Sequence, residues 1–270
     1  MTPTAAPGES YYHRTGEHRY TPTTHAEGAW NAGEHHFGPL AGLVVHAIDG
    51  HRAAGPADDL VLARISYDIL GFLALDECEI TVETIRPGRT VELLEAVVAV
   101  AGRPVIRARA WLLTALDTAA VADTPFERLA PPGTFAPWAM SELWDCGYTR
   151  SLHVRRRASG QAGRAAAWVG SHVGLVAGEP SSALAAFVAR VDVVNGMAVQ
   201  RPPTKWTYPN VDMTLHFHRR PEGSWTGLDT TVSFGPDGHG LTSAVLHDVG
   251  GPVGHVQQIL TVRPREGSQR

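Results

Sequence analysis

The chain has 270 residues, of which 43 % are hydrophobic, and its formal net charge is −4 at pH 7. This length allows one large or two small domains with a real core, and the slight negative charge excludes a basic surface that would attract nucleic acid or anionic lipid. The sequence has neither an apolar run of membrane-spanning length nor a signal-peptide layout at its N-terminus, so we expect a cytoplasmic protein. Two cysteines, Cys78 and Cys146, are too few for a disulfide framework.

The first part of the chain reads as a leader followed by a helix and strands. Residues 1–27 are polar and show no sustained periodicity, which is typical of a loose leader. After a short candidate strand around Trp30, apolar residues at helical spacing predict a helix over 38–49, which Gly38-Pro39 opens and Gly50 closes. Alternating residues then predict four strands, at 61–68, 76–86, 89–100 and 104–115. Residues 28–115 should therefore form one unit.

The same order of elements returns in the second part of the chain. Residues 116–149 contain four prolines and have a mixed composition, which predicts an extended linker. Residues 150–264 should form the second unit. Its predicted strand, helix and four strands lie at 162–170, 181–195, 210–218, 225–234, 240–248 and 252–263.

An internal repeat supports this division. Residues 93–114 align without a gap on 241–262, at an offset of 148 residues, with seven identical residues in the window of 22. Such similarity indicates duplication. At the same offset Arg64 corresponds to Asp212, and Ala110 corresponds to Gln258. Because only the second copy carries Asp212 and Gln258, these two residues are the first candidates for a functional site.

The pattern favours an α+β fold built from two sheets. Alternating strands need one covered face, and each half offers one long helix, so each sheet should wrap around its own helix. Joining the two sheets edge to edge would remove exposed strand edges. A broad outer face would remain on the joined sheet, and we expect the chain to form a homo-oligomer.

Several segments resemble acyl-CoA thioesterases of the thioesterase II type. They are WNAGEHHFGPLAGLVVHAI, LARISYDILGFL with ETIRPGR, NVDMTLHFHRRPEGSW, LDTTVSFGPDGHGL and GPVGHVQQILTV. The resemblance implies a tandem, or double, hotdog fold. It also implies an acyl-CoA substrate and hydrolysis without a metal or cofactor, by a water that an Asp, a Gln and a hydroxyl residue orient.

By this resemblance the Asp falls on Asp212 and the Gln on Gln258. The position expected for the hydroxyl carries Val232, so the neighbouring Ser233, Thr231 and Thr230 are the candidates. A carboxylate can take the proton of the water, while an amide and a hydroxyl fix its position. The resemblance also assigns the thioester oxygen to free backbone amides in the first turn of the 38–49 helix, at Gly38, Leu40 and Ala41.

Other interpretations remain open at this point. Asp212 could be a solvated carboxylate at a strand end, and Gln258 could be a surface amide. The alternative functions are a hotdog hydratase or dehydratase and an acyl-binding module without catalysis. His216 and His218 would share one face of a strand, but no metal-binding motif accompanies them, so we expect no metal. Since Arg64 and Ala110 cannot replace Asp212 and Gln258, each chain should hold one working site.

Overall fold

The computed structural model describes residues 9–31, 33–55, 59–158 and 161–265. The first part of the chain forms β1 (Ser10–Arg14), β2 (Arg19–Pro22), α1 (Phe37–Ala53), β3 (Leu60–Ile69), β4 (Cys78–Arg86), β5 (Val91–Val100) and β6 (Arg103–Thr114). The middle part forms β7 (Ala136–Trp138), α2 (Gly147–Arg150), β8 (Leu152–Ala158), β9 (Arg164–Ser171), β10 (Gly174–Val176), α3 (Ala183–Val188) and α4 (Val194–Met197). The last part forms β11 (Trp206–Thr207), β12 (Asp212–Phe217), β13 (Thr226–Phe234), β14 (His239–Asp248), β15 (Gly251–Thr261) and β16 (Arg263–Pro264).

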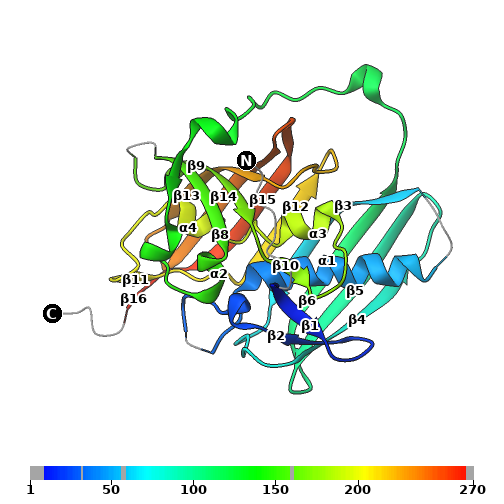
Figure 1. Ribbon diagram of the computed structural model, residues 1–270. Helices are drawn as coiled ribbons and strands as arrows, with labels where there is room; N and C mark the ends of the chain where they lie inside the picture. Colours follow the sequence, from blue (N-terminus) through cyan, green and yellow to red (C-terminus); the bar gives the residue numbers. More distant parts are fainter. Residues whose placement is uncertain (1–8, 32, 56–58, 159–160, 266–270) are drawn as a thin grey trace.

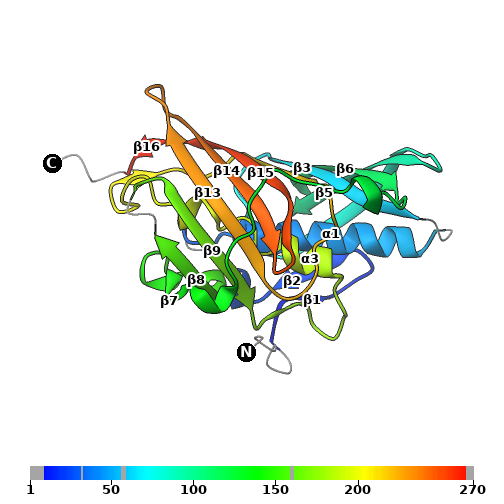
Figure 2. The same ribbon diagram turned by 90° about the horizontal axis from the view of Figure 1, so that it is seen from above.

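One large sheet dominates the molecule. Its 14 strands follow the order β10-β1-β2-β4-β5-β6-β3-β12-β15-β14-β13-β9-β8-β7, while β11 and β16 pair separately. The sheet curves around α1 and α3, which lie on the same side of it (Figures 1 and 2). Alternate strand residues therefore face the helices and form the core. The two sets of four strands predicted from the sequence are confirmed, with bounds that differ by at most two residues.

The repeat seen in the sequence is confirmed by the register of the strands. β4 begins at Cys78 and β13 at Thr226, which is 148 residues later. The bulge between Val98 and Ala99 likewise returns between Leu246 and His247. β3 and β12 join the two sets of strands, and Ser66 lies directly opposite Thr214, again 148 residues away. This antiparallel pair thus marks a local twofold axis between the halves.

The two halves differ in their helices. α1 is continuous over 17 residues and buries Leu40, Leu43, Val44 and Ile48 against the sheet. Each such side chain contributes about 1.5–3 kcal/mol to folding. The helix predicted over 181–195 is wrong in its extent, because the chain forms only α3 and α4 with turns between them.

The break in the second helix follows from its sequence. Valines at 188, 191, 193 and 194 surround Asp192, and Asn195-Gly196 follows; β-branched residues, Asp, Asn and Gly are all weak helix formers. The backbone amides of Arg190, Val191 and Val194 donate to carbonyls three residues earlier instead of four. The turn between α3 and α4 brings the side chain of Asp192 into the interior, where it is 5 % exposed.

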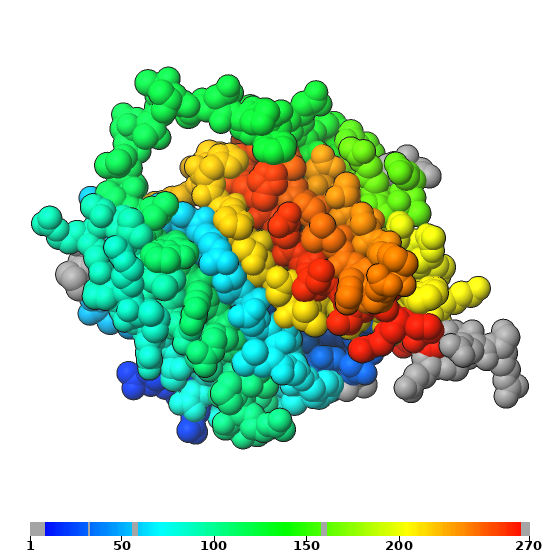
Figure 3. Space-filling view, turned by 180° about the vertical axis from the view of Figure 1, so that it is seen from behind, coloured from blue at the N-terminus to red at the C-terminus, as the bar shows by residue number. Residues whose placement is uncertain are grey.

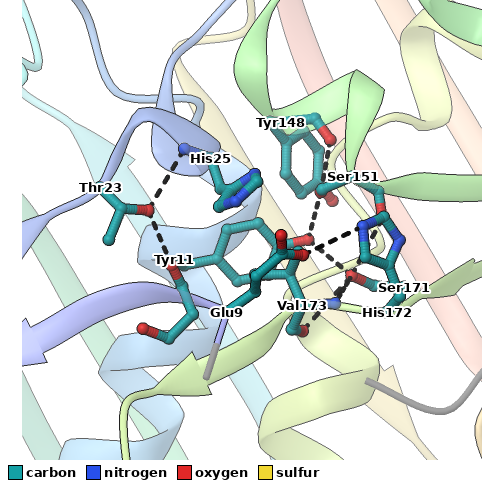
Figure 4. Close-up of polar contacts among 10 residues, drawn as sticks. Glu9, Tyr11, Thr23, His25, Tyr148, Ser151, Ser171, His172 and Val173 are labelled. Carbon is teal, nitrogen blue, oxygen red and sulfur yellow. Dashed lines mark hydrogen bonds and ion pairs between the residues drawn. The ribbon is translucent and has the colours of Figure 1, made fainter. Parts of the chain in front are cut away.

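The expectation of a loose leader over residues 1–27 is wrong for the residues that the structure describes, which begin at Glu9. β1 and β2 belong to the large sheet, and Tyr11, Tyr12 and Tyr20 are buried. The hydroxyl of Tyr11 lies 2.7 Å from Ser151 Oγ and 2.8 Å from Ser171 Oγ, contacts that tie β1 to the second half of the chain (Figure 4). The burial of three tyrosines explains the order of this segment.

The predicted linker over 116–149 is extended only in its first part. The connection after β6 arches along one edge of the molecule (Figures 1 and 3). Its second part includes β7, which pairs with β8, and it buries Phe135, Trp144 and Tyr148 against the second half. Short 3-10 helices lie at Thr24–Ala26, Ala119–Val121, Pro132–Thr134 and Met140–Glu142. Within the described ranges, no helix has the length and apolar character needed to cross a membrane.

Candidate active site

Asp192 is the centre of a buried polar cluster. The side-chain amide of Gln258 on β15 donates to Asp192 Oδ1 over 2.7 Å, and the amide of Asn210, just before β12, donates to the same oxygen over 3.2 Å. On the other side of the carboxyl group, His36 Nδ1 lies 3.4 Å from Asp192 Oδ2. His36 is the N-cap of α1. The cluster therefore combines residues from both halves of the chain.

The buried environment of Asp192 brings its pKa into the neutral range. Burial raises the pKa of Asp192 to about 7, although hydrogen bonds from Asn210, Gln258 and the backbone amide of Gly38 act in the opposite direction. Burial disfavours the charged carboxylate because the interior solvates charge poorly. A carboxyl group with this pKa can accept a proton and release it again at physiological pH, as general acid–base catalysis requires.

His36 is neutral in this site. Burial lowers its pKa to about 3, and its Nδ1 accepts the backbone N–H of Gly38 over 3.1 Å. Since Nδ1 accepts, the ring carries its proton on Nε2. Asp192 Oδ2 therefore faces a neutral ring at 3.4 Å, and the contact is not an ion pair.

Gln258 offers a second polar atom to a ligand. The residue is fully buried, and its Oε1 has no hydrogen-bond partner among the described residues. Thr242 lies directly opposite Gln258 on β14, and its buried hydroxyl also lacks a partner among those residues. An unpaired buried acceptor costs about 1–3 kcal/mol, so these atoms are suited to hold a water or a polar group of a substrate beside Asp192.

The start of α1 approaches the second half closely. A Cβ added at Gly38 would lie 2.8 Å from the carbonyl oxygen of Ala189 and 3.0 Å from the hydroxyl of Tyr148. That hydroxyl itself donates to the Ala189 carbonyl over 2.6 Å. Only glycine fits at position 38 without a shift of the backbone, and this closeness brings the first turn of α1 next to Asp192.

The structure does not bring Asp212 and Gln258 together. Thr214 pairs with Gln257, so Met213 shares the inner face with Gln258 while Asp212 belongs to the outer face. Asp212 is half-buried there, and its Oδ1 accepts the backbone N–H of Ile259 over 2.6 Å. Burial raises the pKa of Asp212, but this carboxylate cannot act on a group that Gln258 holds inside the sheet.

The predicted hydroxyl residues are also divided between the outer and the inner face of the sheet. Thr231 and Ser233 are exposed, whereas Val232 between them is buried on the inner face. Thr230 also points inward, and its buried hydroxyl has no partner among the described residues. The expectation that Thr231 or Ser233 completes a site with Gln258 is therefore wrong in geometry.

Of the three predicted helix amides, Gly38 alone remains a candidate. α1 begins at Phe37 after the cap His36, so the amides of Leu40 and Ala41 fall within the i→i−4 hydrogen-bond ladder of the helix. The amide of Gly38 is directed at His36 and Asp192. An oxygen atom that binds at this amide would lie beside the carboxyl group.

The sequence reasoning missed Asp192, Asn210 and His36. A signal for the first two was present in the repeat, because at the offset of 148 residues Asp192 corresponds to Val44 and Asn210 to Leu62. These are the same apolar-to-polar differences that identify Gln258 against Ala110. His36 carries the same signal in the opposite direction, because at this offset it corresponds to Leu184 in the second half.

Comparisons with known proteins agree with the arrangement of the two halves. The acyl-CoA thioesterase N-terminal domain family matches residues 26–113, and the acyl-CoA thioesterase C-terminal domain family matches residues 123–262. No curated protein is significantly similar to the chain.

Solved structures identify the fold. A hotdog-fold protein of Alicyclobacillus acidocaldarius has a TM-score of 0.72 and 13 % identity, over 93 % of this chain and 95 % of that protein. An acyl-CoA thioesterase II of Mycobacterium marinum has a TM-score of 0.65 and 16 % identity, over 96 % of this chain and 97 % of that protein. Likeness at such identities shows the hotdog fold. Together with the two family matches, it establishes that the chain belongs to the acyl-CoA thioesterase family and is a thioester hydrolase.

Proposed function

We propose that the protein hydrolyses an acyl-CoA thioester to a carboxylate and free CoA, with Asp192 as the general base. The observation that carries this proposal is the buried carboxyl group of Asp192, held by the side-chain amides of Gln258 and Asn210 beside the first turn of α1. The role of base thus moves from Asp212 to Asp192, while Gln258 keeps the positioning role expected from the sequence.

The reaction follows from the groups around Asp192. The ionised carboxylate takes a proton from a water molecule that Gln258 Oε1 helps to position, and the water oxygen forms a bond to the thioester carbon. The carbon–sulfur bond then breaks, the CoA thiolate leaves with the proton that Asp192 accepted, and the carboxylic acid formed releases its remaining proton to solvent. Because the attacking group is water, no acyl-enzyme forms, and the carboxyl group of Asp192 returns to its starting state.

The amide of Gly38 is the proposed donor to the developing oxyanion. Backbone amides at a helix start carry partial positive charge and need no reorganisation during the reaction. In the structure this amide contacts His36 Nδ1 and Asp192. Since a protonated carboxyl group is a weaker acceptor than a carboxylate, the amide becomes available to the thioester oxygen as Asp192 accepts the proton.

We also propose that the fold is a tandem hotdog with one working site per chain. The local twofold axis at Ser66 and Thr214 supports this arrangement. A second site related by this axis would carry Val44, Leu62 and Ala110 in place of Asp192, Asn210 and Gln258. None of these three aliphatic side chains can accept a proton or position a water.

The test is the release of free thiol from acyl-CoA by the wild-type protein and by Asp192→Asn. The substitution keeps the shape of the side chain but removes its basicity, so kcat should fall by roughly 10²–10⁴. A variant that retains the wild-type kcat would refute the assignment of Asp192. A wild-type protein that releases no thiol from any acyl-CoA would refute the choice of substrate.

A further inference from the structure

The free space beside Asp192 is small. One cavity of about 70 Å³ is bordered by Asp192, Asn210, His36 and the apolar side chains of Phe37 and Ile69. A neighbouring cavity of about 30 Å³ shares Trp30, His36 and Asn195 with the first. For comparison, a protein cavity of about 150 Å³ binds benzene, which has six carbon atoms. At that ratio the larger cavity accommodates about three carbon atoms, and the two cavities together accommodate about four.

Trp30 borders both cavities, Trp144 borders the smaller one, and Tyr208 packs against these two rings. Trp30 meets Trp144 edge-on with 5.1 Å between ring centroids, and it meets Tyr208 in the same way at 5.3 Å. Trp144 and Tyr208 are themselves 5.8 Å apart and nearly perpendicular. We call these three residues the aromatic wall. Edge-to-face contacts of this kind add about 0.5–1.5 kcal/mol per pair to the energy of burial.

The aromatic wall is held in place by polar contacts to the backbone. The indole N–H of Trp144 donates to the carbonyl of Gly196 over 3.2 Å, and the hydroxyl of Tyr208 donates to the carbonyl of Arg201 over 3.2 Å. Tyr208 is fully buried, and Trp144 is 7 % exposed. A long acyl chain could enter only if these rings moved, at the cost of both the packing and the hydrogen bonds.

The first half of the chain contains a cavity at the position equivalent to the active site, and this cavity lacks the aromatic wall. A cavity of about 290 Å³ lies where the local twofold axis places the counterpart of the active site, and Ile48, Leu60 and Leu62 border it. At the offset of 148 residues these correspond to Gly196, Tyr208 and Asn210. The half with catalytic residues is thus the half in which an aromatic ring replaces a leucine and the cavity is smaller.

We propose that the active site selects thioesters of short acyl groups, with two to four carbon atoms, and that the aromatic wall sets this limit. The proposal rests on the function proposed above. Acetyl, propionyl and butyryl groups fit a space of this size, and an octanoyl chain does not. Three mutually packed rings should set a sharp limit on acyl-chain length. Each further methylene group of the substrate would have to displace a rigid ring, whereas a flexible side chain could simply move aside.

The test compares kcat/KM for acetyl-, butyryl-, octanoyl- and palmitoyl-CoA. We expect the wild-type protein to prefer butyryl-CoA over octanoyl-CoA by roughly tenfold or more, the lower range of the cost of overpacking. Tyr208→Leu introduces the residue that the first half carries, and it should reduce this preference at least tenfold. The control Trp138→Leu changes a tryptophan on β7 that packs against Arg156, and it should leave the preference unchanged. Equal or faster hydrolysis of octanoyl-CoA by the wild-type protein would overturn the proposal.

Two further measurements distinguish a failure of the chain-length limit from a failure of the proposed mechanism. Gly196→Ala should lower activity on butyryl-CoA more than on acetyl-CoA, because its Cβ would lie 3.0 Å from Met140 Cε and 3.1 Å from Trp144 Nε1; an equal loss on both substrates would contradict the proposal. Calorimetric binding of butyryl-CoA and octanoyl-CoA to Asp192→Asn tests the selectivity without turnover. Tighter binding of butyryl-CoA would support the short-chain limit even if the mechanism is wrong, and tighter binding of octanoyl-CoA would refute the limit.

Discussion

Asp192→Asn should stabilise the fold at alkaline pH although it lowers kcat. The pKa of Asp192 is raised from 3.8 to about 7, mainly by burial. The folded state therefore binds the proton more tightly than the unfolded state, and the stability of the wild-type protein falls as the pH rises from about 4 to about 7. A raised pKa of this size corresponds to about 4 kcal/mol of unfolding free energy that is lost above pH 7.

The asparagine variant escapes this loss because its side chain carries no charge. Its oxygen can still accept from the side-chain amides of Gln258 and Asn210, which donate to Asp192 Oδ1 in the wild-type protein. Urea unfolding of both proteins at pH 4 and at pH 8 measures the effect. We expect similar stabilities at pH 4 and a gain of about 2–4 kcal/mol for the variant at pH 8.

Asp237→Asn, in the exposed turn before β14, is the matched control and should behave like the wild-type protein at both pH values. If the stability difference between Asp192→Asn and the wild-type protein were the same at pH 4 and pH 8, the pKa of the Asp192 carboxyl group would not be raised by folding. Our reasoning about the site would then fail.

The remaining predictions concern turnover and packing. The kcat of the wild-type protein should rise with pH through about 7, because only the ionised form of Asp192 accepts a proton; a flat profile from pH 5.5 to pH 8.5 would count against that base. Gln258→Leu should lower kcat by roughly 10–10² through loss of water positioning, whereas Gln257→Leu on the exposed face should not, and equal effects of the two would contradict the inward role of Gln258. Gly38→Ala should cost about 1–3 kcal/mol of stability, because its Cβ would lie 2.8 Å from the Ala189 carbonyl. In contrast, Gly50→Ala in the same helix meets nothing within 4 Å and should stabilise the protein by about 0.5–1 kcal/mol; thermal unfolding of both variants checks this, and an unaffected Gly38→Ala would refute the close approach of α1.

The strands could be predicted because their signal is local. Alternation with period two, interrupted by Pro-Gly turns, locates β3 to β6 and β12 to β15, and the repeat in the sequence relates the two sets to each other. The strands formed by residues 9–22 could not be predicted in the same way. Their strands are short, and they are stable because three tyrosines are buried against distant parts of the chain.

The site was only partly predictable, because it depends on which face of a strand a residue occupies. Asp212 and Gln258 both differ in polarity from their counterparts in the repeat, but the pairing of β12 with β15 places them on opposite faces. Asp192 lies in a turn that a continuous helix over 181–195 would not contain. Comparing every residue of that segment with α1 at the offset of 148 residues would have identified Asp192 against Val44. Self-association and the location in the cell stay predictions.

The most direct test of our account compares kcat for Asp192→Asn and Asp212→Asn in thiol release from a saturating short-chain acyl-CoA. Both substitutions remove one carboxylate from neighbouring parts of the second half, but only Asp192 lies on the inner face with Gln258. We predict that Asp192→Asn loses roughly 10²–10⁴ in kcat and that Asp212→Asn stays within about threefold of the wild-type protein, as expected for a partly exposed carboxylate away from the reaction. The reverse order, with Asp212→Asn inactive and Asp192→Asn active, would contradict the assignment of the catalytic base.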